Sequence, residues 1–261
     1  MRTVLKTALY AVALLVGRIA GRTDGAVVLM YHSVSRNDWR WSVDPEVFKR
    51  QIAHLAKHRT VVPLANVVAY ARGEKTLPRN AVALTFDDGY KDTLTEVLPI
   101  LKEYNLSATL FLTSDLGQKE TLHNLPRPTW DDVRALHASG LFSIQVHGRT
   151  HASLISLAPD SLELREELIG CADDIEREIG VRPTVVAYPY GNKTLDIADA
   201  VRNMGFEAAF GTREGVVEQG VHPYVFPRVS VERIMSQSLS FLRAEACAVR
   251  IVAALRSHLR S

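Results

Sequence analysis

AVALTFDDGY, at residues 81–90, joins an apolar run to two adjacent carboxylates and a glycine. The run has the composition of a buried β-strand, so the sequence predicts a strand that ends in a functional site. Adjacent carboxylates repel each other unless a cation or a shared proton offsets the repulsion, and a metal ion is the simplest remedy. The alternative is that Asp87 and Asp88 only cap the next helix and charge its first turn.

A second strand-like run, at residues 141–146, ends in a pair of histidines, His147 and His151. Two histidines four residues apart at a strand end can converge on one ion, although this spacing is common by chance. With Asp88 they would form a set of two histidines and one carboxylate, which leaves coordination positions open for water and substrate. Asp88, His147 and His151 are therefore candidate metal ligands.

A third strand-like run, at residues 184–187, ends in Tyr-Pro-Tyr-Gly at 188–191. Together the motifs Thr-Phe-Asp-Asp-Gly-Tyr, His-x-x-x-His and Tyr-Pro-Tyr-Gly resemble those of the polysaccharide deacetylase family of metal-dependent carbohydrate de-N-acetylases. Met-Tyr-His-Ser-Val at 30–34 and Pro-Arg-Val at 227–229 belong to the same resemblance. The resemblance therefore covers most of the chain.

The resemblance implies a role for each motif residue. Asp88, His147 and His151 match the ligands of a divalent metal ion, with zinc as the expected metal. Asp87 matches the general base that takes a proton from the attacking water, and Tyr190 matches the position whose backbone N–H holds the oxyanion. The family reaction is hydrolysis of the acetamide of an N-acetylated sugar, so the expected partner is an N-acetylated glycan.

The chain departs from the family pattern at two positions. Many relatives place an arginine three residues before the tyrosine of the third motif, to pair with the base, but here this position is Ala187. Arg228 is the candidate replacement. Many relatives also supply the general acid from a Leu-x-His strand, and no such triplet follows Tyr190 here. His32 is the candidate acid, the alternative being a purely structural histidine at a strand end.

These departures resemble the branch of the family that de-N-acetylates poly-N-acetylglucosamine in exopolysaccharide export. In that branch the order of the strands in the barrel is circularly permuted. The resemblance implies that the first strand takes the place of the usual last one, which puts His32 where the acid is needed.

Composition and pattern place the chain in the α/β class. At 261 residues and 47% hydrophobic content it can bury a large core. Strand-like and helix-like segments alternate, which predicts parallel βα units. The sequence therefore predicts a distorted (β/α)7-8 barrel of the polysaccharide deacetylase type over residues 23–235. The expected strands are 26–31, 61–64, 81–86, 108–112, 141–146, 184–187, 206–210 and 224–231, and the expected helices are 45–55, 64–71, 94–104, 129–136, 161–179 and 195–204.

Several other reactive residue types are expected to be structural. Cys171 and Cys247 form no disulfide framework and are predicted to be small buried residues. Asp131 and Asp132 are predicted to be acids in the first turn of a helix. The histidines expected to be surface or structural residues are His54, His58, His123 and His137.

The N-terminal segment, residues 1–22, is apolar and basic. It carries four basic residues and no acid around an apolar run at 7–17. Such a run suits the core of a signal peptide and is short for a membrane span. Three interpretations stay open: an uncleaved signal or anchor, a segment that lies on or packs against another surface, and a cleaved signal.

The C-terminal segment, residues 236–261, predicts a basic amphipathic helix. The helix either packs on the barrel or contacts an anionic membrane surface. With the N-terminal segment it favours a protein of the cell envelope, membrane-associated or exported, although the cytoplasmic face also stays open. Nucleic-acid binding is not expected, because the basic residues cluster at the termini without an aromatic-rich patch. The sequence carries no signal of the oligomeric state.

Two other functions compete with a glycan deacetylase. One is an amidase or deformylase of the same fold that acts on a lipid-linked sugar or another small amide. The other is a non-catalytic glycan-binding barrel, against which stand both carboxylates and both histidines, since binding alone does not require them.

Overall fold

The structure, a computed structural model, describes residues 25–116 and 121–233. The predicted N-terminal segment 1–22 and C-terminal helix 236–261 lie outside the described residues, as does Cys247. Within the described ranges, no helix combines the length and the apolar character needed to cross a bilayer.

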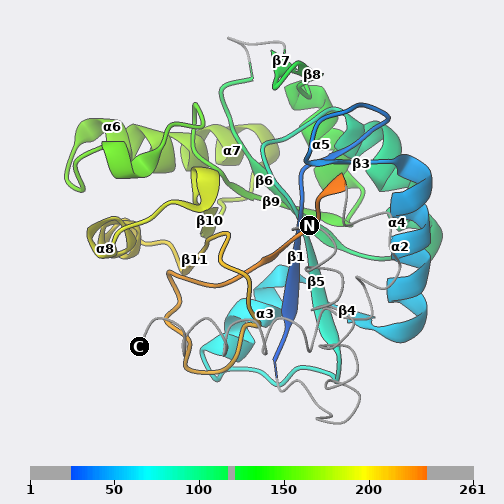
Figure 1. The fold of residues 1–261 in the computed structure, drawn as a ribbon. Helices are drawn as coiled ribbons and strands as arrows, with labels where there is room; N and C mark the ends of the chain where they lie inside the picture. Colours follow the sequence, from blue (N-terminus) through cyan, green and yellow to red (C-terminus); the bar gives the residue numbers. More distant parts are fainter. Residues whose placement is uncertain (1–24, 117–120, 234–261) are drawn as a thin grey trace, which may run out of the picture.

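A curled sheet of eight parallel strands forms the centre of the fold (Figure 1). Its order is β11-β10-β9-β6-β5-β1-β12, and β4 pairs with the first residues of β5. The first strand, β1, thus lies between β5 and the last strand, β12. The bounds are β1 Val27–Tyr31, β4 Thr60–Val61, β5 Ala81–Phe86, β6 Ala108–Leu112, β9 Phe142–Val146, β10 Val185–Ala187, β11 Ala208–Phe210 and β12 Val229–Ser230.

The two edges of the sheet approach each other. A parallel bridge joins Phe210, at the end of β11, to Phe226, shortly before β12. The Gly211 N–H also donates to the Phe226 carbonyl at 2.9 Å. The prediction of a distorted α/β barrel is therefore confirmed, in the form of a curled, mostly parallel sheet.

Helices cover the outer face of the sheet, with α2, α4 and α5 on one flank and α6, α7 and α8 on the other, while α3 lies near the start of β5 (Figure 1). Two π-helical turns, η1 and η3, adjoin α4 and α7, and two short strand pairs lie outside the sheet. The bounds are α2 Pro45–His58, α3 Leu64–Ala71, η1 Thr93–Val97, α4 Leu98–Tyr104, α5 Trp130–Ala138, η2 Leu154–Ser156, α6 Leu162–Arg165, η3 Glu166–Gly170, α7 Cys171–Ile179, η4 Pro189–Gly191 and α8 Leu195–Asn203, with the pairs β2 Ser33–Val34 with β3 Ser42–Val43 and β7 Thr121–Leu122 with β8 Leu125–Pro126.

Local sequence accounts for where the helices begin. The side chain of Asp44 caps α2, and Thr129 and Asp132 form a capping box at the start of α5. The predicted start of α5, with Asp131 and Asp132 as first-turn acids, is therefore confirmed. Gly180 adopts φ 74 just after α7 and ends it, because glycine takes this left-handed conformation without steric cost.

Two apolar cores lie on the two faces of the sheet. Alternate strand residues such as Leu29 and Leu84 point outward and pack against the helices. The intervening residues, such as Val28 and Ala83, point into the barrel, where Val67 of α3 joins them. The helix α3 therefore packs into the inner core, and the opposite, carboxyl ends of the strands are left for the site.

Three predictions about the elements were wrong in part. The strand predicted at 61–64 is only Thr60–Val61, because Pro63 has no N–H to donate and precedes α3, which begins at Leu64. The predicted strand 224–231 is paired only at Val229–Ser230 and at Phe226, because Pro227 has no N–H to donate and the segment before it turns. The helices predicted at 94–104 and 161–179 each contain a π-helical turn. Such turns insert an extra residue that the helical period of a sequence does not reveal.

Candidate metal centre and active site

The carboxyl ends of the parallel strands meet at one edge of the barrel. Hydrogen bonds between neighbouring strands continue past the strand ends: the Asp87 N–H donates to the Tyr31 carbonyl at 2.9 Å, and the His147 N–H donates to the Leu112 carbonyl at 3.0 Å. The residues that follow the strands therefore surround a cleft of about 330 Å³. It is lined by Met30, His32, Trp39, Trp41, Asp87, Asp88, His123, His147, His151, Tyr188, Tyr190, Gly191 and Thr212.

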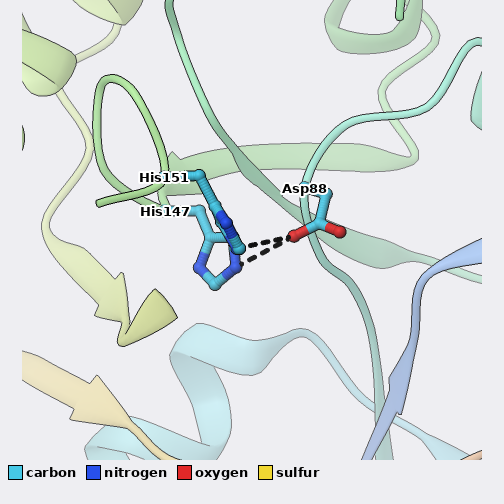
Figure 2. A group of neighbouring side chains, drawn as sticks. All are labelled: Asp88, His147 and His151. Atoms are coloured by element: carbon cyan, nitrogen blue, oxygen red, sulfur yellow. Dashed lines mark ion pairs between the residues drawn. The ribbon is translucent and has the colours of Figure 1, made fainter. Parts of the chain in front are cut away.

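Asp88, His147 and His151 come together in the cleft (Figure 2). Their ligand atoms lie within 4.8 Å of one another. Oδ1 of Asp88 is 3.2 Å from Nε2 of His147 and 3.2 Å from Nε2 of His151. All three side chains are buried. The structure thus assembles the predicted ligand set from the ends of β5 and β9.

The chemistry of these atoms fits a cation. The Nδ1 of His147 lies 2.8 Å from the carbonyl oxygen of Ala187, which can only accept, so Nδ1 carries the hydrogen and Nε2 of the neutral ring presents a lone pair. Asp88 Oδ1 is buried and makes no hydrogen bond. Acceptor atoms that face one another in this way require a cation or a proton between them. The contact with Ala187 also fixes the ring orientation, as is usual for metal-binding histidines.

The pKa values of Asp88 and His147 are shifted because the two side chains are buried next to each other. Burial raises the pKa of Asp88, but the contacts with His147 and His151 outweigh it and hold that pKa well below its ordinary value. Burial lowers the pKa of His147, but the charge of Asp87 and the contact with Asp88 outweigh it, so the net shift is upward. The site therefore favours positive charge, which a bound ion supplies in place of the proton.

Asp87 lies beside this set but has a different partner. Its Oδ1 and Oδ2 accept hydrogen bonds from Nη1 and Nη2 of Arg228, both at 2.7 Å. Arg228 is fully buried; its Nε also donates to the Gly211 carbonyl, and its guanidinium lies over the ring of Phe111. The structure therefore places Arg228 where the sequence predicted it, as the partner of Asp87 in place of the family arginine missing at Ala187.

The arginine keeps Asp87 ionised. Burial raises the pKa of Asp87, but the charge of Arg228, that of His147 and the two hydrogen bonds outweigh it, and the net shift is downward. The two adjacent carboxylates thus have different surroundings: Asp88 faces the two histidines, and Asp87 faces the guanidinium of Arg228. Neither caps a helix, so the alternative of purely local helix-capping acids is wrong.

Tyr190 lies at the rim of the cleft in a left-handed conformation, with φ 60. Its ring packs edge-on against His151, with the ring centroids 4.6 Å apart. The next residue, Gly191, also has positive φ, and a Cβ there would lie 2.0 Å from Oγ1 of Thr212. The glycine therefore lets the chain turn tightly beside the cleft. The role of the Tyr190 N–H toward an oxyanion stays a prediction.

His32 follows β1 and lines the cleft, as the circular permutation implies. Its ring contacts Trp41 at 4.9 Å and Trp39 at 5.8 Å between centroids. Nδ1 of His32 is buried and has no hydrogen-bond partner. Burial lowers its pKa, although Asp88 and Asp87 oppose the shift. A lowered pKa makes the imidazolium a stronger acid and leaves less of it protonated at neutral pH.

His123, predicted to be a surface or structural residue, is exposed, but it also belongs to the cleft. It stands on the turn between β7 and β8 and lines the cleft. Its Nδ1 lies 2.8 Å from the hydroxyl of Tyr90, and that hydroxyl donates to Oδ2 of Asp88 at 2.7 Å. The last residue of the Thr-Phe-Asp-Asp-Gly-Tyr motif thus steadies the second oxygen of a candidate ligand, while nothing in the sequence marks His123.

Trp39 and Trp41 form an aromatic wall of the cleft that the sequence analysis missed. Trp39 stacks on His123, with centroids 4.8 Å apart and planes 20° apart. Both tryptophans belong to the polar loop between β2 and β3, and His32 lies just before β2. The sequence did carry a signal for this wall, because two of the three tryptophans of the chain lie within three residues of each other.

Fold and site together define a class: an α/β barrel with a triad that could hold a metal ion and a separate carboxylate at the carboxyl ends of its strands. The family model described as polysaccharide deacetylase matches residues 74–209. The chain belongs to the polysaccharide deacetylase family.

Individual relatives agree with this assignment. The chain is 26% identical over 214 residues to YxkH of Bacillus subtilis (strain 168), covering 81% of this chain and 73% of that protein. It is 22% identical over 210 residues to a poly-beta-1,6-N-acetyl-D-glucosamine N-deacetylase of Staphylococcus aureus (strain MSSA476), covering 78% and 72%. The structure of IcaB from Ammonifex degensii superposes with a TM-score of 0.76 and 25% identity, over 86% of this chain and 98% of that one.

The geometry of the triad predicts that His147→Ala removes the ion. Wild-type protein is expected to carry about one divalent ion per chain, and His147→Ala is expected to carry almost none after dialysis, because two remaining ligands hold an ion poorly. Metal content is measured by elemental analysis of purified protein. His58→Ala, an exposed histidine at the end of α2, is the control and should keep the ion. Equal metal in wild type and His147→Ala would contradict the assignment.

The separate environment of Asp87 predicts that Asp87→Asn keeps the ion but loses turnover. An amide still accepts a hydrogen bond from Arg228 but cannot take a proton, so we expect kcat to fall on the order of 10²–10⁴-fold. Asp88→Asn serves as the contrasting variant, since it should lose the ion as well. Loss of metal in Asp87→Asn would mean that the two aspartates have exchanged roles.

Proposed function

We propose that this chain is a metal-dependent hydrolase that removes N-acetyl groups from the N-acetylated amino sugars of an exopolysaccharide or cell-surface glycan. Family membership supports the reaction class. The poly-beta-1,6-N-acetyl-D-glucosamine N-deacetylase among the relatives, and the structural likeness to IcaB, support a glycan of the poly-N-acetylglucosamine type.

One observation carries the proposal: two adjacent buried carboxylates have different partners. Asp88 faces two histidine nitrogens, whereas Asp87, the residue before it, is held by two hydrogen bonds from Arg228. Metal-assisted hydrolysis of an unactivated amide requires this arrangement: one carboxylate that holds the ion and a neighbouring carboxylate that can take a proton from water. A protein that only binds a glycan needs neither an ionised base nor three converging ligands at the floor of its cleft.

Each residue of the cleft then has a defined task. A bound divalent ion would supply Lewis acidity, lowering the pKa of a water and polarising the acetamide carbonyl. Asp87, kept ionised by Arg228, accepts a proton from the attacking water. Tyr190 lines the same cleft, and its backbone N–H would serve as the donor that stabilises negative charge on the carbonyl oxygen.

The leaving group also needs a proton, because an amide nitrogen departs as a free amine only when protonated. His32 lines the same cleft, and its pKa is lowered by burial. As an imidazolium it is therefore a strong enough acid to give its proton to the nitrogen while acetate is released. Its contacts with Trp39 and Trp41 hold the ring in place for this transfer.

The aromatic wall suits a sugar ring. Trp39, Trp41 and the exposed ring of Tyr190 border a cleft whose floor is polar, which matches the apolar faces and polar edges of a pyranose. Small-molecule sites commonly combine aromatic walls with few polar groups. The substrate class of the proposal, an N-acetylated glycan, follows from this lining together with the family.

The identity of the ion and the place of the protein in the cell are finer parts of the proposal. We propose zinc, because two imidazole nitrogens and one carboxylate with open positions are typical of catalytic zinc sites. We also propose that the protein acts at the cell envelope, supported by the basic, partly apolar residues 1–22 and the basic, partly apolar residues 236–261.

Acetate release from defined N-acetylglucosamine oligomers tests the function. Wild-type protein should release acetate, a chelator should abolish the release, and added zinc should restore it, because the ion is part of the catalytic set. Small acetamides and lipid-linked amino sugars are run in parallel. Faster turnover on these would favour the amidase, and binding of oligomers without acetate release, with the ion present, would favour a glycan-binding barrel.

The position of His32 predicts a change in the pH profile. The acid must be protonated, so wild-type turnover should fall as pH rises through the pKa of His32. His32→Ala should lower kcat on the order of 10²–10⁴-fold, remove this alkaline limb and leave metal content unchanged. The measurement is kcat against pH at saturating substrate. A His32→Ala enzyme that keeps the alkaline limb would show that another group donates the proton.

A further inference from the structure

The two candidate histidine ligands share one short loop, from His147 to His151, and this loop has an unfavourable backbone. His151 has φ 66, a left-handed conformation that non-glycine residues rarely adopt. Such a conformation persists only where the surroundings impose it. The relative positions of His147 and His151 therefore depend on what holds the residues between them.

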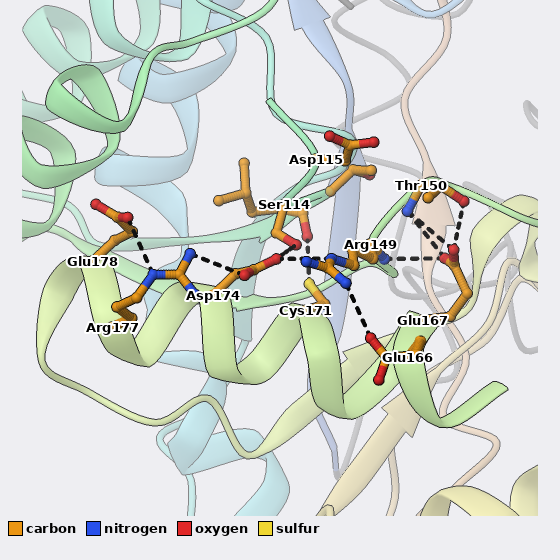
Figure 3. Close-up of polar contacts among 12 residues, drawn as sticks. Ser114, Asp115, Arg149, Thr150, Glu166, Glu167, Cys171, Asp174, Arg177 and Glu178 are labelled. Carbon is orange, nitrogen blue, oxygen red and sulfur yellow. Dashed lines mark hydrogen bonds and ion pairs between the residues drawn. The ribbon is translucent and has the colours of Figure 1, made fainter. Parts of the chain in front are cut away.

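A buried carboxylate holds the amides of these residues. Glu167, 7% exposed, accepts hydrogen bonds from the N–H of Arg149 at 3.0 Å, from the N–H of Thr150 at 3.1 Å and from the hydroxyl of Thr150 (Figure 3). Two successive backbone amides immediately before His151 thus point at the same carboxylate. Hydrogen bonds to an ionised acceptor are about twice as strong as neutral ones.

The other residues of the loop are adapted to this carboxylate. At Gly148, which has φ 85, a Cβ would lie 2.9 Å from Oε2 of Glu167, so only glycine lets the carboxylate approach so closely. On the opposite side, Ser114 and Asp115 donate their N–H groups to the carbonyls of Gly148 and Arg149. The carbonyls of the loop are therefore fixed from the end of β6, and its amides are fixed from Glu167.

Glu167 itself stands on the π-helical turn η3, between α6 and α7. A π-helical turn carries one more residue than an α-helical one and changes the direction in which its side chains point. Such turns occur often at functional sites. Here the turn aims Glu167 at the loop, while the neighbouring Glu166 points to the surface and pairs with the Arg149 guanidinium at 3.0 Å.

We propose that Glu167 is a positioning residue that sets the ligand geometry of His147 and His151 before the ion binds. This inference rests on the metal site of the proposed function. Glu167 touches neither the ion site nor the substrate cleft and acts through the backbone of the loop. Residues that orient metal ligands in this way typically contribute roughly 10- to 100-fold to metal affinity.

Glu166 provides a matched control for Glu167. The two glutamates are adjacent on the same turn, and both contact Arg149, but Glu166 contacts only its guanidinium and is 55% exposed at its side chain. Replacing each by glutamine makes the same chemical change one residue apart. Only Glu167→Gln removes charge from the acceptor of the Arg149 and Thr150 amides.

The first experiment titrates zinc and cobalt into ion-free protein by calorimetry. Glu167→Gln should bind each ion roughly 10- to 100-fold more weakly than wild type, and Glu166→Gln should bind within twofold of wild type. The visible spectrum of the cobalt-saturated protein should change in Glu167→Gln and not in Glu166→Gln, because it reports the geometry of the ligands rather than the stability of the fold.

The second experiment uses no ion. Hydrogen exchange of the Arg149 and Thr150 amides in ion-free protein should be faster in Glu167→Gln and unchanged in Glu166→Gln. If Glu167→Gln does not fold, Thr150→Val, which removes one donor to the carboxylate and leaves Glu167 in place, should weaken ion binding in the same direction.

The outcomes separate this inference from the proposed function. Wild-type affinity, an unchanged cobalt spectrum and unchanged exchange in Glu167→Gln would overturn the role of Glu167 while leaving the metal site intact. Wild-type protein that binds neither zinc nor cobalt would overturn the metal site itself.

Discussion

Two adjacent carboxylates buried at the end of β5 set the requirements that the rest of the site satisfies. Asp87 and Asp88 are each 2% exposed, and a buried charge is costly unless it is paired. The chain turns between them, since Asp88 has φ 72, and so the two side chains reach different partners. Arg228 neutralises the first through two hydrogen bonds, and the second faces a histidine pair, where a bound cation would compensate its charge. In the proposed function this difference between the partners would let one carboxylate exchange a proton while the other holds the ion.

The parallel sheet makes this division possible. Since all eight strands run in the same direction, their carboxyl ends meet at one edge. Placing β1 between β5 and β12 brings Arg228 into contact with Asp87 and places His32, from the other half of the chain, in the same cleft. The inner core and α3 pack the barrel below them, so the polar residues lie at the floor of a cleft. The tryptophan loop after β2 then encloses that cleft on one side.

Backbone strain is concentrated around the same cleft. Seven described residues other than glycine have positive φ, and four of them line the cleft: Asp88, His123, His151 and Tyr190. Each such conformation costs on the order of 1–3 kcal/mol and must be imposed by contacts elsewhere. For His151 the proposed contacts are indirect, because Glu167 accepts hydrogen bonds from Arg149 and Thr150, the two residues before it. The strained residues are thus those whose backbone conformation orients groups toward the cleft, at a cost in folding stability. Through Glu167, the π-helical turn η3 is connected to one of these residues.

The sequence by itself determined the strands, their end motifs and the identity of most site residues. A buried strand has a local signature of composition and length, and a carboxylate or histidine directly after it is visible without any structure, as at Asp87 and His147. Only the tertiary structure decided the contacts between distant segments. Arg228 and Asp87 are 141 residues apart, and the sequence offered Arg228 only as a candidate. His123 and Glu167 had no signal at all, because a polar residue on a turn or a helix has the same local pattern whether it faces water or a buried loop. Burial and hydrogen bonding across such distances arise from the packing of the whole barrel, which no local period in the sequence encodes.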